Sequence, residues 1–313
     1  MTIEALTFAT SDLWCIAPAY ANSAYRPGRE PIPTKGKGDT VAVVELFGTL
    51  DKRAMVPIRE RVAALAANED VAEIVLLVDS PGGTVAGVHD LHTMIARAAE
   101  KKRVTAVVED LCCSGAVWAV AGATEIVIGE TSTMGSIGVF NVVIDQSKLM
   151  EKVGVEVIVI RSGEHKGAGV SGAKISAEQL TELKRRVDVQ ARHFTAAVAR
   201  GRRMKIEKAA ELADGRVFIG REAVAAGLAD RVGMYEDVLS EAVKRTRPYA
   251  INRLTGAAAL AKFDELVEEK AIGFVTPEAA AEQLRYQYPQ LAAAAEKHRR
   301  EGTLTKSSWR PGL

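Results

Sequence analysis

The sequence predicts an α/β fold in which parallel strands alternate with helices through most of residues 40–247. The first observation is the continuous apolar run at Ile74–Asp79, which is typical of a strand buried on both faces of a parallel sheet. The second is the helical spacing of apolar residues from Val88 to Ala98, followed by a β-rich run at Val104–Val108. Strand–helix–strand alternation of this kind indicates a layered structure with right-handed crossovers.

The same periodicities place the other elements in order along the chain. Further strands are expected at Val41–Phe47, Ile126–Ile128, Val155–Ile160 and Val217–Ile219. Further helices are expected at Met55–Ala67, Ser114–Gly122, Ser147–Val153, Glu178–Arg200, Ile206–Ala213 and Arg221–Gly227. A glycine-rich loop is expected from Ser162 to Gly172.

Two segments differ in composition from this central part. Residues 1–39 contain a stretch rich in proline, glycine and lysine, which predicts a linker or a surface strap. Residues 248–313 are rich in Ala, Glu, Lys and Gln, which predicts two or three helices that fray after Arg299. This extension is compatible with solvated helices, an oligomerisation arm or a partner-binding tail. The expected parts are therefore 1–39, 40–247 and 248–313.

Composition and charge exclude several classes of function. The formal net charge is +1, from 41 basic and 40 acidic residues, so no nucleic-acid partner is expected. Cys15, Cys112 and Cys113 are an odd number of cysteines, which favours a reducing compartment over a disulfide framework. The start lacks a signal-peptide pattern, and no apolar run is long enough for a membrane anchor. We therefore expect a cytoplasmic protein.

Ser114 is the first candidate catalytic residue. It lies between a strand-like run and an apolar helix-like run, and Gly115 follows it. A serine in this position is most often an ordinary N-cap. However, the apolar helix is expected to be buried, so its positive end would point into a pocket. This environment suits a nucleophile whose tetrahedral intermediate carries negative charge.

Gly82 and Gly83 follow the buried strand in the motif Asp-Ser-Pro-Gly-Gly. Two glycines can form a plain tight turn. They also allow backbone N–H groups to face a ligand without obstruction by side chains. An oxyanion hole needs two such donors, and we expect the amides of Gly83, or Gly82, and Gly115 to supply them.

Lys166 lies in the glycine-rich loop and is the candidate general base. A lysine takes this role only when burial favours its neutral form, and most loop lysines are simply solvated. Ser136, in the segment Met-Gly-Ser-Ile-Gly, has a hydroxyl that could orient the lysine amine, or it could belong to an ordinary turn.

On these motifs the chain resembles the signal peptide peptidase A (protease IV) family of the ClpP/crotonase superfamily. The resemblance covers residues 40–245, and its most specific part is the block Ala213–Asp230. It implies stacked parallel β-sheets with flanking helices, in a single-copy domain with a helical C-terminal extension. It also implies Ser114 as nucleophile, Lys166 as general base, Ser136 as the orienting hydroxyl, and glycine amides as the oxyanion hole. Homo-oligomers are implied, with a catalytic pocket that a neighbour could complete.

Two departures from the family pattern bear on the biological role. Membrane-bound members carry an N-terminal anchor that this sequence lacks, and the C-terminal extension is not part of the common domain. In both respects the chain is similar to phage capsid-maturation proteases, which cleave scaffolding protein and often themselves. We favour this role, with scaffold, capsid or portal proteins as partners and the host cytoplasm or assembling head as location. The alternative is a bacterial cytosolic peptidase that degrades signal-peptide-like segments.

The expected reaction is peptide hydrolysis by acyl transfer, which requires no metal or cofactor. The polypeptide substrate is expected to bind extended, as an added strand beside Gly82 and Gly83. His165 is the rival general base because it precedes Lys166, and Cys113 is the rival nucleophile. Two other classes stay open: a crotonase-type coenzyme A enzyme, and a catalytically silent capsid or scaffold component.

Overall fold

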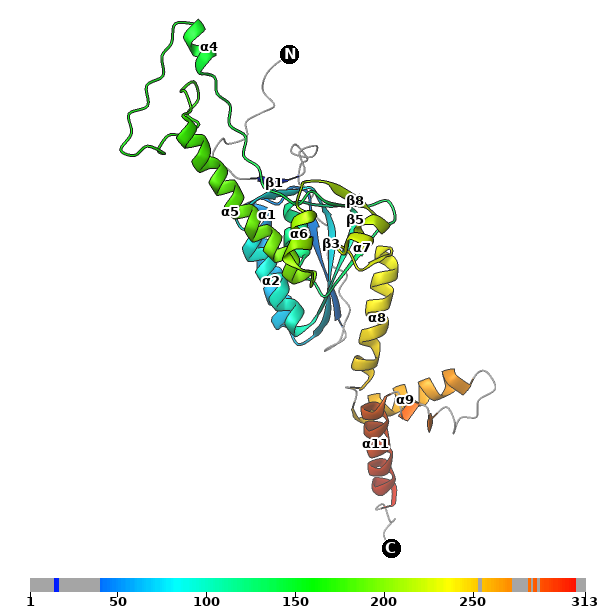
Figure 1. The fold of residues 1–313 in the computed structure, drawn as a ribbon. Coiled ribbons are helices and arrows are strands. Elements are labelled where there is room, and N and C mark those ends of the chain that lie inside the picture. Colours follow the sequence, from blue (N-terminus) through cyan, green and yellow to red (C-terminus); the bar gives the residue numbers. More distant parts are fainter. Residues whose placement is uncertain are drawn as a thin grey trace. The chain divides into compact units, whose positions relative to one another are not determined.

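The computed structural model describes residues 14–16, 40–252, 255–271, 281–282, 284–285 and 288–307. Its centre is a seven-stranded, mostly parallel sheet flanked by helices, which confirms the predicted α/β class (Figure 1). The main strand order is β2 (Thr40–Phe47), β3 (Val71–Ser80), β5 (Arg103–Cys113), β6 (Glu125–Ile128) and β9 (Arg231–Val232). β7 (Thr133–Gly135) pairs in parallel with β5, and β8 (Val217–Ile219) pairs antiparallel with β7.

Two further strands form a separate pair, and helices account for the remaining described elements. β1 (Trp14–Ile16) pairs antiparallel with β4 (Gly82–Thr84). The helices are α1 (Lys52–Ala67), α2 (Val88–Lys101), α3 (Gly115–Val120), α4 (Ser147–Lys152), α5 (Ala177–Gly201), α6 (Ile206–Glu211), α7 (Arg221–Ala226), α8 (Tyr235–Asn252), α9 (Gly256–Ala271) and α11 (Pro289–Ser307). Among the described residues, none of the helices has both the length and the apolar character needed to cross a bilayer.

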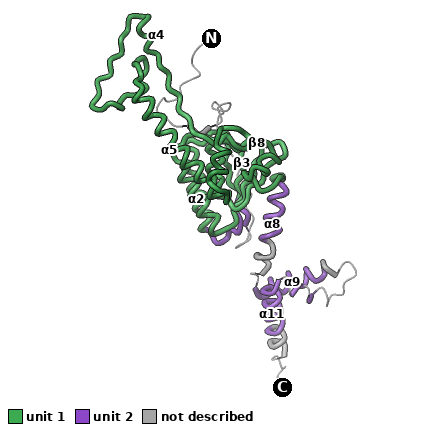
Figure 2. The backbone as a smooth tube through the Cα atoms, in the orientation of Figure 1, with its two compact units in different colours: residues 1–31, 43–67, 74–235 green, residues 32–42, 68–73, 236–313 purple. Residues whose placement is uncertain are grey.

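The chain divides into two compact units, which Figure 2 shows in different colours. The first comprises residues 1–31, 43–67 and 74–235, and the second comprises residues 32–42, 68–73 and 236–313. In the first unit the short helix α3 is buried along its whole length. Its Trp118 stacks on Phe194 of α5, with 4.9 Å between ring centroids and 10° between ring planes. This contact fixes α3 against the long helix α5.

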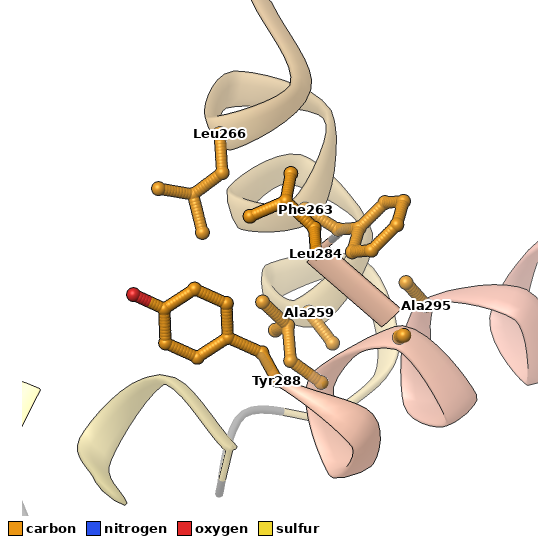
Figure 3. Packing of buried hydrophobic residues seen from close by; sticks show 8 residues of the cluster. Ala259, Phe263, Leu266, Leu284, Tyr288 and Ala295 are labelled. Carbon is orange, nitrogen blue, oxygen red and sulfur yellow. The ribbon is translucent and has the colours of Figure 1, made fainter. Parts of the chain in front are cut away.

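The second unit has a small hydrophobic core of its own, to which α9 and α11 contribute (Figure 3). Its buried members are Ala259, Phe263, Leu266, Leu284, Tyr288, Leu291, Ala292 and Ala295. Arg299 of α11 also forms an ion pair with Asp264 of α9 at 2.6 Å. The helix continues to Ser307, so the fraying expected after Arg299 is not observed. The C-terminal helices therefore pack on each other rather than being solvated on all sides.

The stretch Val155–Ile160 is the main difference from the predicted elements. The sequence predicts a strand there, but the structure has irregular backbone. A strand needs a neighbour to complete its ladder of hydrogen bonds, and this stretch has none among the described residues. Val157 and Val159 are half-buried, whereas Ile158 is 74% and Ile160 is 97% accessible.

Candidate active site

Ser114 lies where β5 ends and α3 begins, and its backbone is strained. Its φ is 53° and its ψ is −118°, a region that residues other than glycine rarely adopt. The backbone N–H donates to Gly135 O at 2.7 Å, and Ser114 O accepts from the N–H of Trp118 at 3.1 Å. The side chain makes no capping hydrogen bond to the helix, unlike that of an ordinary N-cap serine. The hydroxyl is therefore not used to stabilise α3.

Ser136 lies beside Ser114 because two parallel strands end in register. Cys113, the last residue of β5, pairs with Gly135, the last residue of β7. The next residue of each strand is a serine, and neighbouring strands lie about 4.8 Å apart. Ser136 also has a positive φ, 51°, and both serines are buried. The structure thus brings together two of the predicted site residues, each with a positive φ that serine disfavours.

The conformation of Ser136 is held from its other side by β8. Its N–H donates to Arg216 O at 2.7 Å, and Gly135 pairs with Val217. A Cβ atom at Gly135 would lie 2.7 Å from Arg216 O, and its φ is 135°, so only glycine fits there without strain. The block Ala213–Asp230, the most specific part of the sequence pattern, therefore supports the Ser136 side of the site.

The turn at Gly82 and Gly83 is held by a residue that sequence reasoning missed. Ser80 is fully buried, and its hydroxyl donates to Gly48 O at 2.6 Å and accepts from the N–H of Gly82 at 3.1 Å. Its only signal in the sequence is its place before Pro-Gly-Gly. The turn lies next to the helix that follows Ser114, since β4 packs against α3. Ser80 thus positions the backbone that carries the candidate oxyanion donors.

Leu50 forms backbone hydrogen bonds along one edge of β4, and the other edge faces away from Leu50. The N–H of Leu50 donates to Gly82 O at 2.8 Å, and the N–H of Thr84 donates to Leu50 O at 3.0 Å. A Cβ atom at Gly83 would overlap with Leu50 O, so the close approach requires glycine. Because successive residues of a strand point their peptide groups to opposite edges, the N–H of Gly83 faces away from Leu50.

Among the described residues, no hydrogen bond joins Lys166 to Ser114. The chain between β7 and α5 leaves the sheet as a long arm that carries α4 (Figure 1). Lys166 and His165 are both exposed on this arm, whereas Ser114 is 1% exposed. The loop before Lys166 is fixed by Gln179 of α5, whose side-chain amide donates to Glu164 O at 3.0 Å. The loop that carries the lysine is thus attached to the start of α5.

Comparison with known proteins places this arrangement in a family. Residues 96–247, which include both serines, Gly115 and Lys166, match the model of Peptidase family S49. This region of the chain belongs to peptidase family S49. The match contains β5, α3, β7 and β8, the elements that form the site around the two serines.

Three curated relatives illustrate the breadth of the S49 similarity. A Synechocystis protein, provisionally named as a protease, is 35% identical over 182 residues, which cover 56% of this chain and 66% of the relative. Capsid assembly protease C of Escherichia phage lambda is 30% identical over 211 residues, covering 64% and 48%. A signal peptide peptidase SppA of Enterococcus faecium, also provisionally named, is 32% identical over 181 residues, covering 56% and 52%. The chain thus spans about half to two thirds of the length of these relatives.

A solved structure with a related arrangement is that of a mutant of ClpP1 from Listeria monocytogenes. It has a TM-score of 0.44 and 13% sequence identity, and the match covers 63% of this chain and 94% of that chain. The assignment of the fold class rests on the strand order and flanking helices of the chain itself.

The cysteines of the S49 region are poor nucleophiles in this structure. Burial raises the pKa of the Cys113 thiol to about 12, and the pKa of Cys112 is also raised, first by burial and then by Cys113. A thiol with such a pKa stays protonated at neutral pH, and the thiolate is the reactive form. Cys113 therefore has the character of a buried structural residue.

Helix α2 packs against α3, and its histidines lie near Trp118 of α3. The rings of His89 and Trp118 are 6.3 Å apart between centroids, and those of His89 and His92 are 6.5 Å apart. Burial lowers the pKa of His92 to about 4, although backbone hydrogen bonding at Trp118 opposes the shift. In the part of the chain that the structure describes, no hydrogen bond joins either histidine to Ser114.

Proposed function

We propose that this chain is a serine endopeptidase in which Ser114 is the nucleophile and Lys166 is the general base. The observation that carries the proposal is the parallel register of β5 and β7, which ends in two adjacent, strained serines beside the Gly82–Gly83 turn. The hydroxyl of Ser114 makes no hydrogen bond to cap α3, which leaves it available for chemistry. Peptidase family S49 supports the same reaction class.

The proposed reaction is acyl transfer in two steps. Ser114 Oγ attacks the carbonyl carbon of the scissile bond while neutral Lys166 Nζ accepts the hydroxyl proton. The N–H groups of Gly83 and Gly115 stabilise the oxyanion, and the C–N bond breaks as Lys166 returns the proton to the leaving amine. Water then attacks the acyl group with the same base, which releases the second product and the free Ser114 hydroxyl. Ser136 would orient the Lys166 amine during both steps.

We propose that Lys166 reaches the Ser114 site of a neighbouring copy. Eight large apolar side chains on the arm that carries it are exposed, an unusual concentration for a surface segment. They are Val142, Ile144, Leu149, Val153, Val155, Ile158, Ile160 and Val170. A second copy that covered them would also remove Lys166 from water, and desolvation favours the neutral amine that a general base needs. Association of two copies would thus bring Lys166 to Ser114 and, at the same time, favour the neutral form of its amine.

Subunit mixing tests this arrangement. Ser114→Ala and Lys166→Ala should each be inactive alone, but co-expressed subunits should recover about a quarter of wild-type activity. This fraction follows if each site takes its serine and its lysine from adjacent, randomly mixed copies. Co-expression of wild type with the double variant should also leave about a quarter, whereas sites formed within one chain would leave about a half.

Lys174→Ala is the matched control, because Lys174 is another exposed lysine on the same arm. It should retain full activity. Activity in Lys166→Ala alone would remove Lys166 as the base and turn attention to His165. Activity in Ser114→Ala alone would refute the proposed nucleophile. An active wild type with an inactive mixture would refute delivery by a neighbour.

At a finer level we propose that the substrate is a scaffolding protein of an assembling phage capsid. The proposal draws on the similarity to the phage lambda capsid assembly protease, which extends over 64% of this chain. A direct test compares kcat/KM for a purified helical scaffolding protein with that for an apolar signal peptide of about 20 residues. Preference for the signal peptide would instead favour a bacterial SppA-like role.

A further inference from the structure

The short strand β1 lies at the position where a polypeptide substrate would bind. Its three residues pair antiparallel with β4, the strand that contains Gly83. One edge of β4 is already occupied by Leu50, through hydrogen bonds to Gly82 O and from the Thr84 N–H. β1 therefore lies along the other edge, which is the edge that the Gly83 N–H faces. A substrate that adds a strand to β4 needs the same edge.

The register identifies the residue of β1 that faces the candidate oxyanion donor. Trp14 pairs with Thr84, Cys15 with Gly83 and Ile16 with Gly82. In an antiparallel ladder, directly opposed residues either exchange both of their backbone hydrogen bonds or exchange none. Since the peptide groups of Gly83 point toward β1, Cys15 and Gly83 form a pair of the first kind. Cys15 thus has the position of the substrate residue whose carbonyl would enter the oxyanion hole.

We infer that residues Trp14–Ile16 act as an intramolecular pseudosubstrate that competes with polypeptide substrates for the edge of β4. This inference rests on the proposed function, since it identifies an occupant of the proposed peptide-binding strand. The competing groups are backbone groups, so the segment can be displaced by any extended polypeptide that offers a better ladder or better side-chain contacts. Because the segment is tethered to the enzyme, it competes at a high effective concentration.

Occupancy can be measured without any catalytic activity, by hydrogen–deuterium exchange in full-length Ser114→Ala. In this background the amides of Cys15 and Gly83, the pair that exchanges hydrogen bonds, should be protected. Adding Cys15→Pro should remove the protection of the Gly83 amide, because proline lacks the N–H needed for the paired ladder. The amides of Gly82 and Thr84, which donate to Ser80 and Leu50, should stay protected. Ala9→Pro, which introduces proline outside residues 14–16, is the matched control and should leave the protection of Gly83 unchanged.

Competition can then be measured with the serine restored. Cys15→Pro should lower KM for an unfolded fluorescent polypeptide several-fold at unchanged kcat, whereas Ala9→Pro should behave as wild type. A synthetic peptide with the sequence of residues 11–20 should inhibit Cys15→Pro competitively.

The two measurements separate the possible failures. Equal exchange in Cys15→Pro and its parent would overturn the inference, whether or not the enzyme is active. Loss of protection with unchanged KM would overturn the competition between β1 and substrate. Hydrolysis in none of the variants would refute the proposed function, and the exchange result would still report whether β1 occupies β4.

Discussion

At the scale of single residues, the site consists of two serines held in a conformation that serine disfavours. A backbone with positive φ at a residue other than glycine costs on the order of 1–3 kcal/mol and persists only where the surroundings impose it. Here the surroundings are the hydrogen bonds from Ser114 to Gly135 and from Ser136 to Arg216. Such strain is typical of functional sites, because it fixes the direction of a side chain at the expense of stability.

Ser136→Gly should therefore raise thermal stability and lower activity at the same time. Glycine adopts a φ of 51° without strain, so we expect stabilisation of about 1 kcal/mol. Loss of the hydroxyl that we propose orients Lys166 should lower kcat at least tenfold. Thermal unfolding and steady-state kinetics on the same preparations test both effects. Arg203→Gly is the matched control: its φ is 52° and its side chain is exposed, so it should gain stability and retain activity.

The buried imidazole of His92 predicts a pH dependence of stability. Burial lowers its folded-state pKa from 6.5 to about 4, so between these values the unfolded chain binds more protons than the folded chain. Stability should therefore fall as pH decreases from about 6.5 to 4, by roughly 3 kcal/mol from this residue. Urea unfolding of wild type and His92→Gln across this range tests the expectation. If the two proteins lose stability in parallel, His92 is not the cause.

At the scale of elements, the site depends on strands that end together. β5 continues to Cys113, five residues beyond the predicted end at Val108, and this extension brings the chain to Ser114 beside β7. β8 then closes the other edge of β7, and Arg216, just before it, accepts the N–H of Ser136. Three short elements thus set the conformation of one serine, so a change in β7 should affect both stability and catalysis.

Gly135→Ala should show that coupling. The added methyl group would lie 2.7 Å from Arg216 O on a backbone with φ of 135°, and we expect a loss of about 2 kcal/mol or more together with most of the activity. Gly138→Ala provides the control, because a Cβ atom there meets nothing within 4 Å. Its effect should be within about 0.5 kcal/mol. Urea unfolding and kcat would reveal the difference, and equal behaviour of the two variants would contradict the assigned role of β7.

The sequence predicted most of these elements because their apolar periodicity is strong, as in β3 and α5. The sequence also pointed to Ser114, Ser136 and the Gly-Gly turn as candidate site residues. Sequence reasoning missed Ser80, whose importance lies in a hydrogen bond to Gly48, 32 residues away. It also assigned a strand to Val155–Ile160 from β-branched residues alone. Periodicity reports local preference, whereas a strand also requires a partner strand in space.

At the scale of the whole molecule, the candidate site residues differ sharply in burial. The serines and the glycine turn are buried in the first unit, while Lys166 lies on its exposed arm. Eight large apolar side chains of that arm are exposed, and burying exposed apolar surface is the dominant driving force for association. Assembly and catalysis should therefore respond to the same substitutions on the arm.

Ile160→Glu tests this dependence most directly, because Ile160 is 97% exposed and its replacement removes nothing from the core of the single chain. A buried, unpaired carboxylate would oppose association, so the variant should sediment as a smaller species and lose at least tenfold in activity. Its thermal unfolding as a dilute monomer should match that of the dissociated wild type. Met234→Glu is the control: Met234 is an exposed hydrophobic residue outside the arm, and its variant should assemble and cleave normally. Full activity in a strictly monomeric Ile160→Glu would mean that Lys166 reaches Ser114 within its own chain, through a movement of the arm toward the sheet.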